Sequence, residues 1–303
     1  MLQDKVALVT GASRGIGAGV ARELASQGAT VILAARTRTA GAAVEWGPGG
    51  PPIPGSLAET LAVITKAGGR AEAYPIDLTV TEDIARMVDH IAGRYGRIDI
   101  LANCAMGLPS SYKGSIWDSP VEDWHAQIDI GLKAKYMAAR AVSQIMRKQG
   151  SGLIANISSG ASMDEYYNPM FRIAMSGIDR MTTAIAHDLR PHGVSVVSIW
   201  PRWVRTEWVA LAARQPRAGF EVTETDLGAS DTPEFTGRAI SALSSDPDVM
   251  SRSGRIFPVV QLAHDYGFTD LDGTRPALDD PTRKWMRKLQ IIHATLEDHP
   301  ETT

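Results

Sequence analysis

The sequence contains very little cysteine: Cys104 is the only one in 303 residues. A single cysteine excludes an internal disulfide and fits a reducing compartment, and no Cys–His spacing suggests a metal site. The net charge of −3 gives no reason to expect a nucleic-acid partner. The sequence contains no apolar run long enough to span a bilayer, and no signal peptide is recognisable. We therefore expect a soluble, cytoplasmic protein without a metal, whose partner is a small molecule.

The N-terminal segment has the pattern of a nucleotide-binding turn. Residues 5–10 form a short β-branched apolar run, which predicts a buried parallel strand. A glycine-rich stretch follows, and a helical pattern then continues to Gly28. Glycines allow the backbone to approach a pyrophosphate, and the helix N-terminus offers it unpaired N–H groups. The position between strand and helix makes this signal strong. The candidate cofactor-binding residues of the turn are Gly11, Ser13, Arg14, Ile16 and Gly17.

The spacing Thr-Gly-x-x-x-Gly-x-Gly from Thr10 to Gly17 resembles the short-chain dehydrogenase/reductase superfamily. The resemblance covers roughly residues 1–273, and residues 262–273 are similar to one branch of the superfamily. It implies a doubly wound parallel sheet, the Rossmann fold, with about seven strands and helices on both faces. We expect one such domain over residues 1–275. The long helices at about 122–149 and 170–190 are, by the same resemblance, the surfaces of a homodimer or homotetramer.

Two segments extend the chain beyond a compact family member. Residues 37–56 are rich in glycine, proline and alanine and predict an inserted loop on the adenosine side of the cofactor. A loop of this length either folds over the nucleotide or is a tolerated surface insertion. Residues 276–303 form a C-terminal tail, whose amphipathic stretch at 285–296 is expected to dock on its own subunit or on a neighbour.

The resemblance also implies further cofactor contacts. The second strand ends at Ala35 without the acidic residue that binds a ribose 2′-hydroxyl, and Arg36 follows it. Together with Arg14, this guanidinium favours NADP(H) over NAD(H), since arginine grips a 2′-phosphate that a carboxylate would repel. The alternative interpretation is that Arg36 binds no phosphate and is simply a solvated charge on a loop. The remaining residues that the family pattern places on the cofactor are Asp77, Leu78, Asn103, Ala105, Pro201 and Thr206.

The reactive end departs from the family pattern. Phe171 and Met175 stand where the family has its acid/base tyrosine and its lysine. A phenyl ring has no proton to give, and a thioether cannot hold a positive charge. The catalytic serine corresponds to Ser159, with Ser158 beside it, and Asp129 stands at the position of the family's asparagine. Cys104 stands where the family has an asparagine, and the bulky Met106 and Arg202 replace two glycines beside the nicotinamide.

A substitute for the missing acid is needed if the chain is an oxidoreductase, because a positioned general acid contributes about 10²–10⁴-fold. Tyr167 can supply a phenol from the loop, or it can simply pack against the substrate or a neighbour. Asp129 can hold a proton if it is buried, or it can pair with Lys133 one helical turn on.

Three classes of function are compatible with these residues. The first is an NADP(H)-dependent oxidoreductase with a non-standard mechanism, acting on a small apolar carbonyl, enone or imine-type substrate. The second is a non-redox enzyme, such as a lyase, cyclase or hydrolase, on the same scaffold. The third is a catalytically silent nucleotide-binding partner. The fold does not decide among them.

Overall fold

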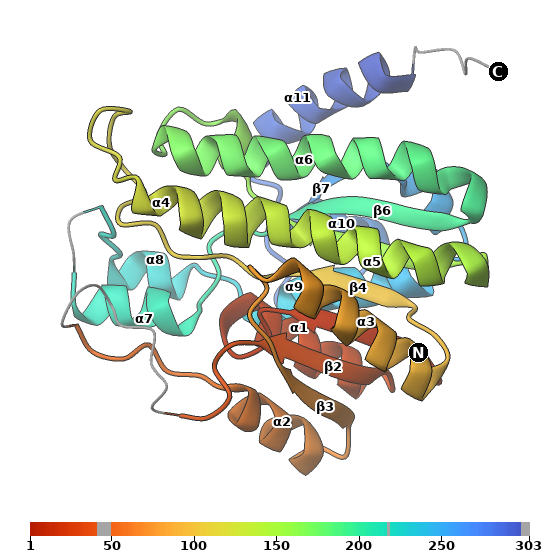
Figure 1. The fold of residues 1–303 in the computed structure, drawn as a ribbon. Helices are drawn as coiled ribbons and strands as arrows, with labels where there is room; N and C mark the ends of the chain where they lie inside the picture. The colour runs from red at the N-terminus through yellow and green to blue at the C-terminus, as the bar shows by residue number, and fades with distance from the viewer. Residues whose placement is uncertain (41–49, 217–218, 298–303) are drawn as a thin grey trace.

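The computed structural model describes residues 1–40, 50–216 and 219–297. Seven strands form one parallel sheet in the order β3-β2-β1-β4-β5-β6-β7 (Figure 1). The strands are β1 (Val6–Thr10), β2 (Thr30–Ala35), β3 (Arg70–Pro75), β4 (Ile100–Asn103), β5 (Gly152–Ile157), β6 (Val194–Trp200) and β7 (Ile256–Pro258). The predicted doubly wound Rossmann sheet is confirmed. The strand order reverses between β1 and β4, which is where ligands bind in such sheets.

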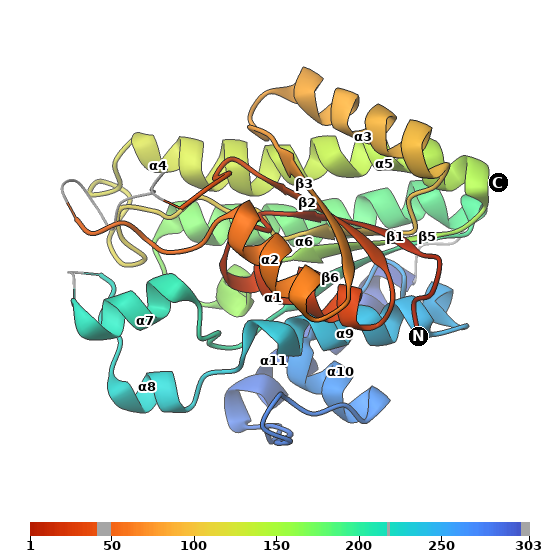
Figure 2. The ribbon, with the colours of Figure 1, turned by 90° about the horizontal axis from the view of Figure 1, so that it is seen from below.

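Helices cover both faces of the sheet (Figure 2). The helices are α1 (Gly15–Ser26), α2 (Leu57–Lys66), α3 (Thr81–Tyr95), α4 (Glu122–Trp124), α5 (Ala134–Gln149), α6 (Pro169–Leu189), α7 (Glu207–Arg214), α8 (Glu224–Gly228), α9 (Pro233–Ser245), α10 (Val259–Tyr266) and α11 (Asp280–Glu297). Alternate side chains of β1 point to opposite faces: Val6 and Leu8 pack with α3, α5 and α6, whereas Ala7 and Val9 pack with α1, α2, α9 and α10. Shorter helical turns are η1 (His125–Lys133), η2 (Gly160–Met163), η3 (Arg190–His192) and η4 (Val249–Arg252).

The predicted helix at 122–149 contains a wide turn. It runs without a break through α4, η1 and α5, and η1 is π-helical. Gly131 lies in this turn, where a Cβ atom would sit 2.4 Å from the Sδ of Met106. The wide turn therefore packs directly on the loop that follows β4. Such π-helical turns occur mostly at functional sites.

The start of α6 sets the orientation of the two atypical residues. Asn168 caps the helix, its Oδ1 accepting the N–H of Phe171 at 2.8 Å, and Pro169 occupies the first turn. With this start, Phe171 and Met175 lie one helical turn apart on the inward face, 8% and 2% exposed. The sequence predicted a helix at about 170–190, and the structure shows one at Pro169–Leu189 that contains both residues.

The segment between β6 and β7 contains helices that the sequence pattern did not predict. The helices α7 and α8 project at the end of the molecule where α4 begins (Figures 1 and 2). They are short, and their apolar residues have a partner far away in the sequence: Val209, Phe220 and Val222 pack on Ile53 of the inserted loop. The described C-terminal part of loop 37–56 thus contacts this segment through Ile53, while residues 41–49 lie outside the described residues.

The C-terminal helix α11 docks on its own chain. Trp285 packs edge-on against Trp200, with ring centroids 6.0 Å apart. Leu289 is 2% exposed in the same cluster, and the Nε2 of His293 accepts the N–H of Ile256 at 3.1 Å. Of the two predicted positions for the tail, the structure shows the one on the same subunit.

We predict that Leu289→Ala lowers the free energy of unfolding by about 2–5 kcal/mol, the usual cost of truncating a buried leucine. Urea unfolding monitored by tryptophan fluorescence measures it. Gln290→Ala, one residue on and exposed, is the matched control and should change stability little. Equal midpoints for the two variants would mean that α11 does not pack as described.

Candidate active site

The glycine turn between β1 and α1 leaves no room for side chains. Gly11 and Gly15 have positive φ angles of 69° and 55°. A Cβ atom on Gly17 would lie 2.3 Å from the carbonyl oxygen of Gly11, and one on Gly11 would lie 2.8 Å from the Cα of Ala105. The main chain is therefore bare at the end of β1. The N–H of Gly15 donates to a carboxylate oxygen of Glu207 at 2.7 Å, so a negative group already lies at the N-terminus of α1.

A cavity of about 720 Å³ opens at this turn and continues past β4, β5 and β6. It lies at the carboxyl ends of the strands, including the β1/β4 reversal, as the fold class predicts. Almost every residue predicted to bind a cofactor lines it: Gly11, Ser13, Arg14, Ile16, Gly17, Arg36, Asp77, Leu78, Ala105, Pro201 and Thr206.

Asn103 is the exception among the predicted cofactor contacts. Its side chain is fully buried behind the cavity wall. The Nδ2 atom donates to Asn156 Oδ1 at 2.9 Å and to the main-chain oxygen of Lys135 at 3.2 Å. The expectation of a direct contact is therefore corrected: the Asn103 side chain does not line the cavity, and its Nδ2 joins β4 to β5 and α5.

Two arginines lie at the end of the cavity nearest β2. The Nη2 of Arg14 donates to the main-chain oxygen of Gly55 at 2.7 Å, so this guanidinium ties one end of the inserted loop to the glycine turn. Arg36 is exposed at the cavity rim. Burial tends to raise the pKa of Asp77, but bonds from Thr79 and the positive charge of Arg36 together hold that pKa below its usual value. Of the two arginines, Arg14 is engaged with the inserted loop, whereas Arg36 lies exposed at the rim.

The two residues that depart from the family pattern, Phe171 and Met175, lie in the cavity wall. Phe171, Met175, Ser158 and Ser159 all line the cavity. Ser158 Oγ donates to the main-chain oxygen of Met175 at 3.2 Å. Ser159 Oγ accepts the N–H of Ala161 at 3.2 Å, which leaves its own proton for another partner. Of the predicted serine pair, Ser159 is thus the freer to meet a substrate oxygen.

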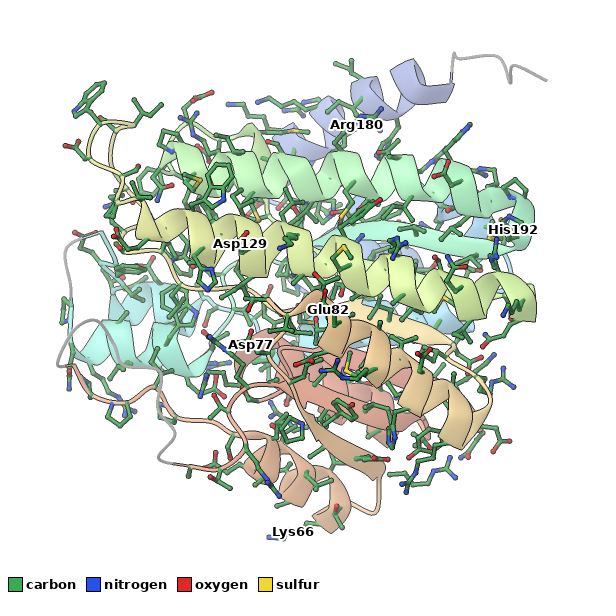
Figure 3. The ribbon with its side chains drawn as sticks, viewed as in Figure 1. Lys66, Asp77, Glu82, Asp129, Arg180 and His192 are labelled. Carbon is green, nitrogen blue, oxygen red and sulfur yellow. The ribbon has the colours of Figure 1, made fainter. Side chains whose placement is uncertain are left out.

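Asp129 does not face the cavity. It lies on η1 in the outer helical layer (Figure 3), and its carboxylate is 3.1 Å from the Nδ1 of His125. The neighbouring Ile130 lines the cavity instead. The expectation that Asp129 supplies a proton, or pairs with Lys133, is corrected, because this carboxylate pairs with His125, four residues earlier on the same helical segment.

Tyr167 belongs to an aromatic wall. Its ring lies 5.4 Å from that of Phe171, and it lines the cavity. Burial, and then the negative charge of Asp164, raises the pKa of the Tyr167 phenol, which therefore keeps its proton at neutral pH. Tyr112, from the loop after β4, packs edge-on against Phe171 at 4.8 Å and also lines the cavity. Burial raises the pKa of Tyr112 as well. No sequence motif marked Tyr112, since it lies in a loop without a pattern.

Lys135 is a second residue that sequence reasoning missed. It is 2% exposed, yet it lines the cavity. Its Nζ donates to the main-chain oxygens of Asn103 at 2.9 Å and Ala105 at 2.7 Å. Burial lowers the pKa of Lys135 to about 8 and raises that of the neighbouring Cys104 thiol to about 12. The signal was present: Lys135 falls on the apolar face of the helix with Ala138, Ala139 and Val142.

The β6–β7 segment closes the other side of the cavity. Arg202 lines it and is held by Asp231, with Nη2 donating to Oδ1 at 2.9 Å and Nε to Oδ2 at 3.3 Å. Trp208 from α7 and Trp285 from α11 complete the wall. Within the described residues there is no group of three or more histidine, cysteine, aspartate or glutamate side chains that fits a metal ion. In the same residues no helix is both long and apolar enough to cross a membrane.

Comparison with known proteins agrees with this architecture. Residues 53–256 match the family model described as enoyl-(acyl carrier protein) reductase, and residues 5–48 match that of short chain dehydrogenase. The chain is 30% identical over 287 residues to dehydrogenase/reductase SDR family member 1 of Mus musculus, covering 92% of this chain and 86% of the relative. It is 31% identical over 262 residues to a 3-oxoacyl-[acyl-carrier-protein] reductase of Synechocystis, covering 85% and 96%.

Solved structures show the same fold. A metagenomic short-chain oxidoreductase in complex with NADP superposes with a TM-score of 0.64 at 29% identity, covering 82% of this chain and 93% of that one. A dehydrogenase from Xanthomonas campestris gives a TM-score of 0.74 at 23% identity, covering 91% and 94%. With a Rossmann sheet, a bare glycine turn at the strand reversal and these relatives, the chain belongs to the short-chain dehydrogenase/reductase family of oxidoreductases.

Proposed function

We propose that the protein is an NADP(H)-dependent oxidoreductase that acts on a small apolar carbonyl, enone or imine-type substrate. The observation that carries this proposal is one cavity that runs from the glycine turn to a part lined by the rings of Tyr112, Tyr167 and Phe171, which we call the aromatic chamber. One end suits a dinucleotide, and the other suits an apolar ligand beside it.

The residues present fit a nicotinamide dinucleotide. The close approach of Gly11, Gly17 and Ala105 leaves bare main chain at the N-terminus of α1, where a pyrophosphate needs it. Asp77 and Leu78, which line the cavity, would hold the adenine side, and Thr206 the nicotinamide side. When bound, the nicotinamide supplies or accepts a hydride.

The preference for NADP(H) rests on Arg36. Its exposed guanidinium at the rim can take a 2′-phosphate, while Arg14 is already engaged with the inserted loop. A relative of known structure was solved with NADP, which supports the same choice.

The proton must come from a group other than residue 171 or 175. We propose the Tyr167 phenol as the donor, because it lines the cavity beside Phe171. Its raised pKa makes it a weak acid, so it suits substrates that need little help from an acid. Ser159 would orient the substrate oxygen through its free hydroxyl proton. An activated double bond or an imine needs less help from an acid than a simple ketone does, which favours such substrates.

The cofactor preference can be tested by titration. We predict that the wild-type chain binds NADPH more tightly than NADH, because Arg36 donates charge-assisted hydrogen bonds to the 2′-phosphate. Arg36→Asp should weaken NADPH binding about 10- to 100-fold, corresponding to hydrogen bonds to a charged group. Quenching of tryptophan fluorescence reports both affinities.

Arg38→Asp is the matched control for charge, because Arg38 is also exposed but does not line the cavity. It should leave the ratio of the two affinities nearly unchanged. Equal affinities for NADPH and NADH in the wild-type chain would refute the preference. If neither nucleotide binds, a non-redox enzyme or a silent partner becomes the better interpretation.

The loss of the acid/base pair can be tested by restoring it. We predict that Phe171→Tyr combined with Met175→Lys raises carbonyl reductase activity on aromatic aldehydes and ketones by about 10²-fold or more, the usual contribution of a positioned acid. Each single change should gain much less, because a tyrosine without its lysine keeps a pKa near 10. Steady-state oxidation of NADPH measures the effect.

Ordinary reductase rates in the wild-type chain on simple ketones would contradict this account unless Tyr167→Phe abolishes them. In that case Tyr167 is the substitute acid. A rate that survives Tyr167→Phe would show that the proton donor lies elsewhere.

We also propose a homodimer or homotetramer formed through the helices at 122–149 and 170–190. Trp124, Tyr136 and Ile173 on these helices are 51%, 47% and 55% exposed, which leaves apolar surface for a second copy to cover. Sedimentation velocity should give a dimer or tetramer mass, and Ile173→Asp should shift it towards the monomer. A monomeric wild-type protein would overturn this proposal.

A further inference from the structure

Lys135 is a buried cation in the cavity wall that the family pattern does not explain. Its side chain is 2% exposed, and two of its three N–H donors go to main-chain oxygens at the end of β4. Within the described chain the third donor has no protein acceptor. Because Lys135 also lines the cavity, that donor is available to whatever the cavity holds.

The Lys135 ammonium and the Met175 thioether line the same cavity, so the chain carries its charge on α5 and not at residue 175. Asn103 and Asn156 are paired neighbours at the ends of β4 and β5. Lys135 bonds the main chain at the end of β4, while Met175 contacts Ser158 just after β5. Lys135 from α5 and Met175 from α6 thus line one cavity over the ends of two adjacent strands, which lie about 5 Å apart.

A purely structural role explains this lysine poorly. Burying an ammonium costs several kcal/mol unless it is compensated. The elements packed on α5 are α3, η1, η3, α6 and the strands. In the described chain, Cys104 is the one ionisable group among them that faces Lys135, and its thiol is neutral at pH 7. Two main-chain oxygens can be satisfied by a neutral donor. The charge itself therefore points to a ligand.

We propose that Lys135 is a ligand-binding cation, which donates its third N–H to a hydroxyl or carbonyl oxygen of the bound dinucleotide at the end of β4. This inference rests on the proposed function, since it needs the dinucleotide to bind. It assigns to α5 a positive charge that residue 175 cannot provide.

The protonation of Lys135 gives a direct test. Its pKa is about 8 in the free protein. An oxygen that accepts a hydrogen bond from the ammonium favours the charged form, so binding should raise the pKa. At about pH 8.5 the complex should then take up roughly half a proton per NADPH. Isothermal titration calorimetry with NADPH, in two buffers of different ionisation enthalpy, measures this number.

Lys135→Gln removes the charge but keeps a donor for the main chain. We expect it to abolish the uptake and to weaken NADPH binding about 10-fold or more, as for the loss of a hydrogen bond from a charged group. Lys133→Gln is the matched control: Lys133 is exposed on the same helical segment and should behave as the wild type. Circular dichroism checks that each variant is folded.

The outcomes separate the two proposals. NADPH that binds the wild-type chain without proton uptake, or with proton release, overturns the role of Lys135, even if Lys135→Gln fails to fold. Unchanged uptake in folded Lys135→Gln overturns it as well. Failure of the wild-type chain to bind NADPH would instead overturn the proposed function on which this inference rests.

Discussion

The bonds at the carboxyl ends of β4 and β5 hold the cavity in place. Lys135 donates to the main chain of Asn103 and Ala105, and Asn103 in turn donates to Asn156 and to the main chain of Lys135. These reciprocal bonds fix α5 against two central strands in a buried setting, where an unmade hydrogen bond costs about 1–3 kcal/mol. The glycine turn, which approaches Ala105, rests on the same point. The cavity at the carboxyl ends of these strands is lined by residues that this network holds in place.

Residues 171 and 175 contribute apolar packing to the cavity wall. Phe171 and Met175 form an apolar cluster with Ala161, Ala174 and Ile178, and burial of each large side chain contributes about 1.5–3 kcal/mol. Losing a positioned acid costs about 3–5 kcal/mol of activation free energy when nothing replaces it. The cavity nevertheless keeps protonated phenols from other elements and a buried ammonium from α5. An enzyme of this design suits substrates that are activated in themselves.

Much of the fold could be predicted from the sequence, because its signals are local. The glycine turn, the alternation of strands and helices and the start of α6 all depend on residues close together in the chain. The placement of Phe171 and Met175 was also predictable, since it follows from helical spacing once the start of the helix is known. Most residues predicted to bind the cofactor line one cavity, because they follow strands whose carboxyl ends meet at one edge of the sheet.

The errors concern features that tertiary packing decides. Asp129 was expected at the cavity, but it pairs with His125, and helical spacing alone did not show which of its neighbours would face the cavity. Asn103 was expected on the cofactor, although its amide is used between strands that pair only in the folded state. Tyr112 comes from a loop without periodicity. Lys135, by contrast, was visible as a lysine on an apolar helical face, and it could have been found.

The most direct test of the central claim is to follow the hydride itself. NADPH deuterated at C4 of the nicotinamide, on either face, should be incubated with the protein and a panel of aromatic carbonyl, enone and imine compounds, and the products examined by mass spectrometry. We predict that one product gains a single deuterium, with enones or imines favoured over simple ketones. Binding of NADPH with no deuterium transfer to any compound of the panel would contradict an oxidoreductase acting on such substrates.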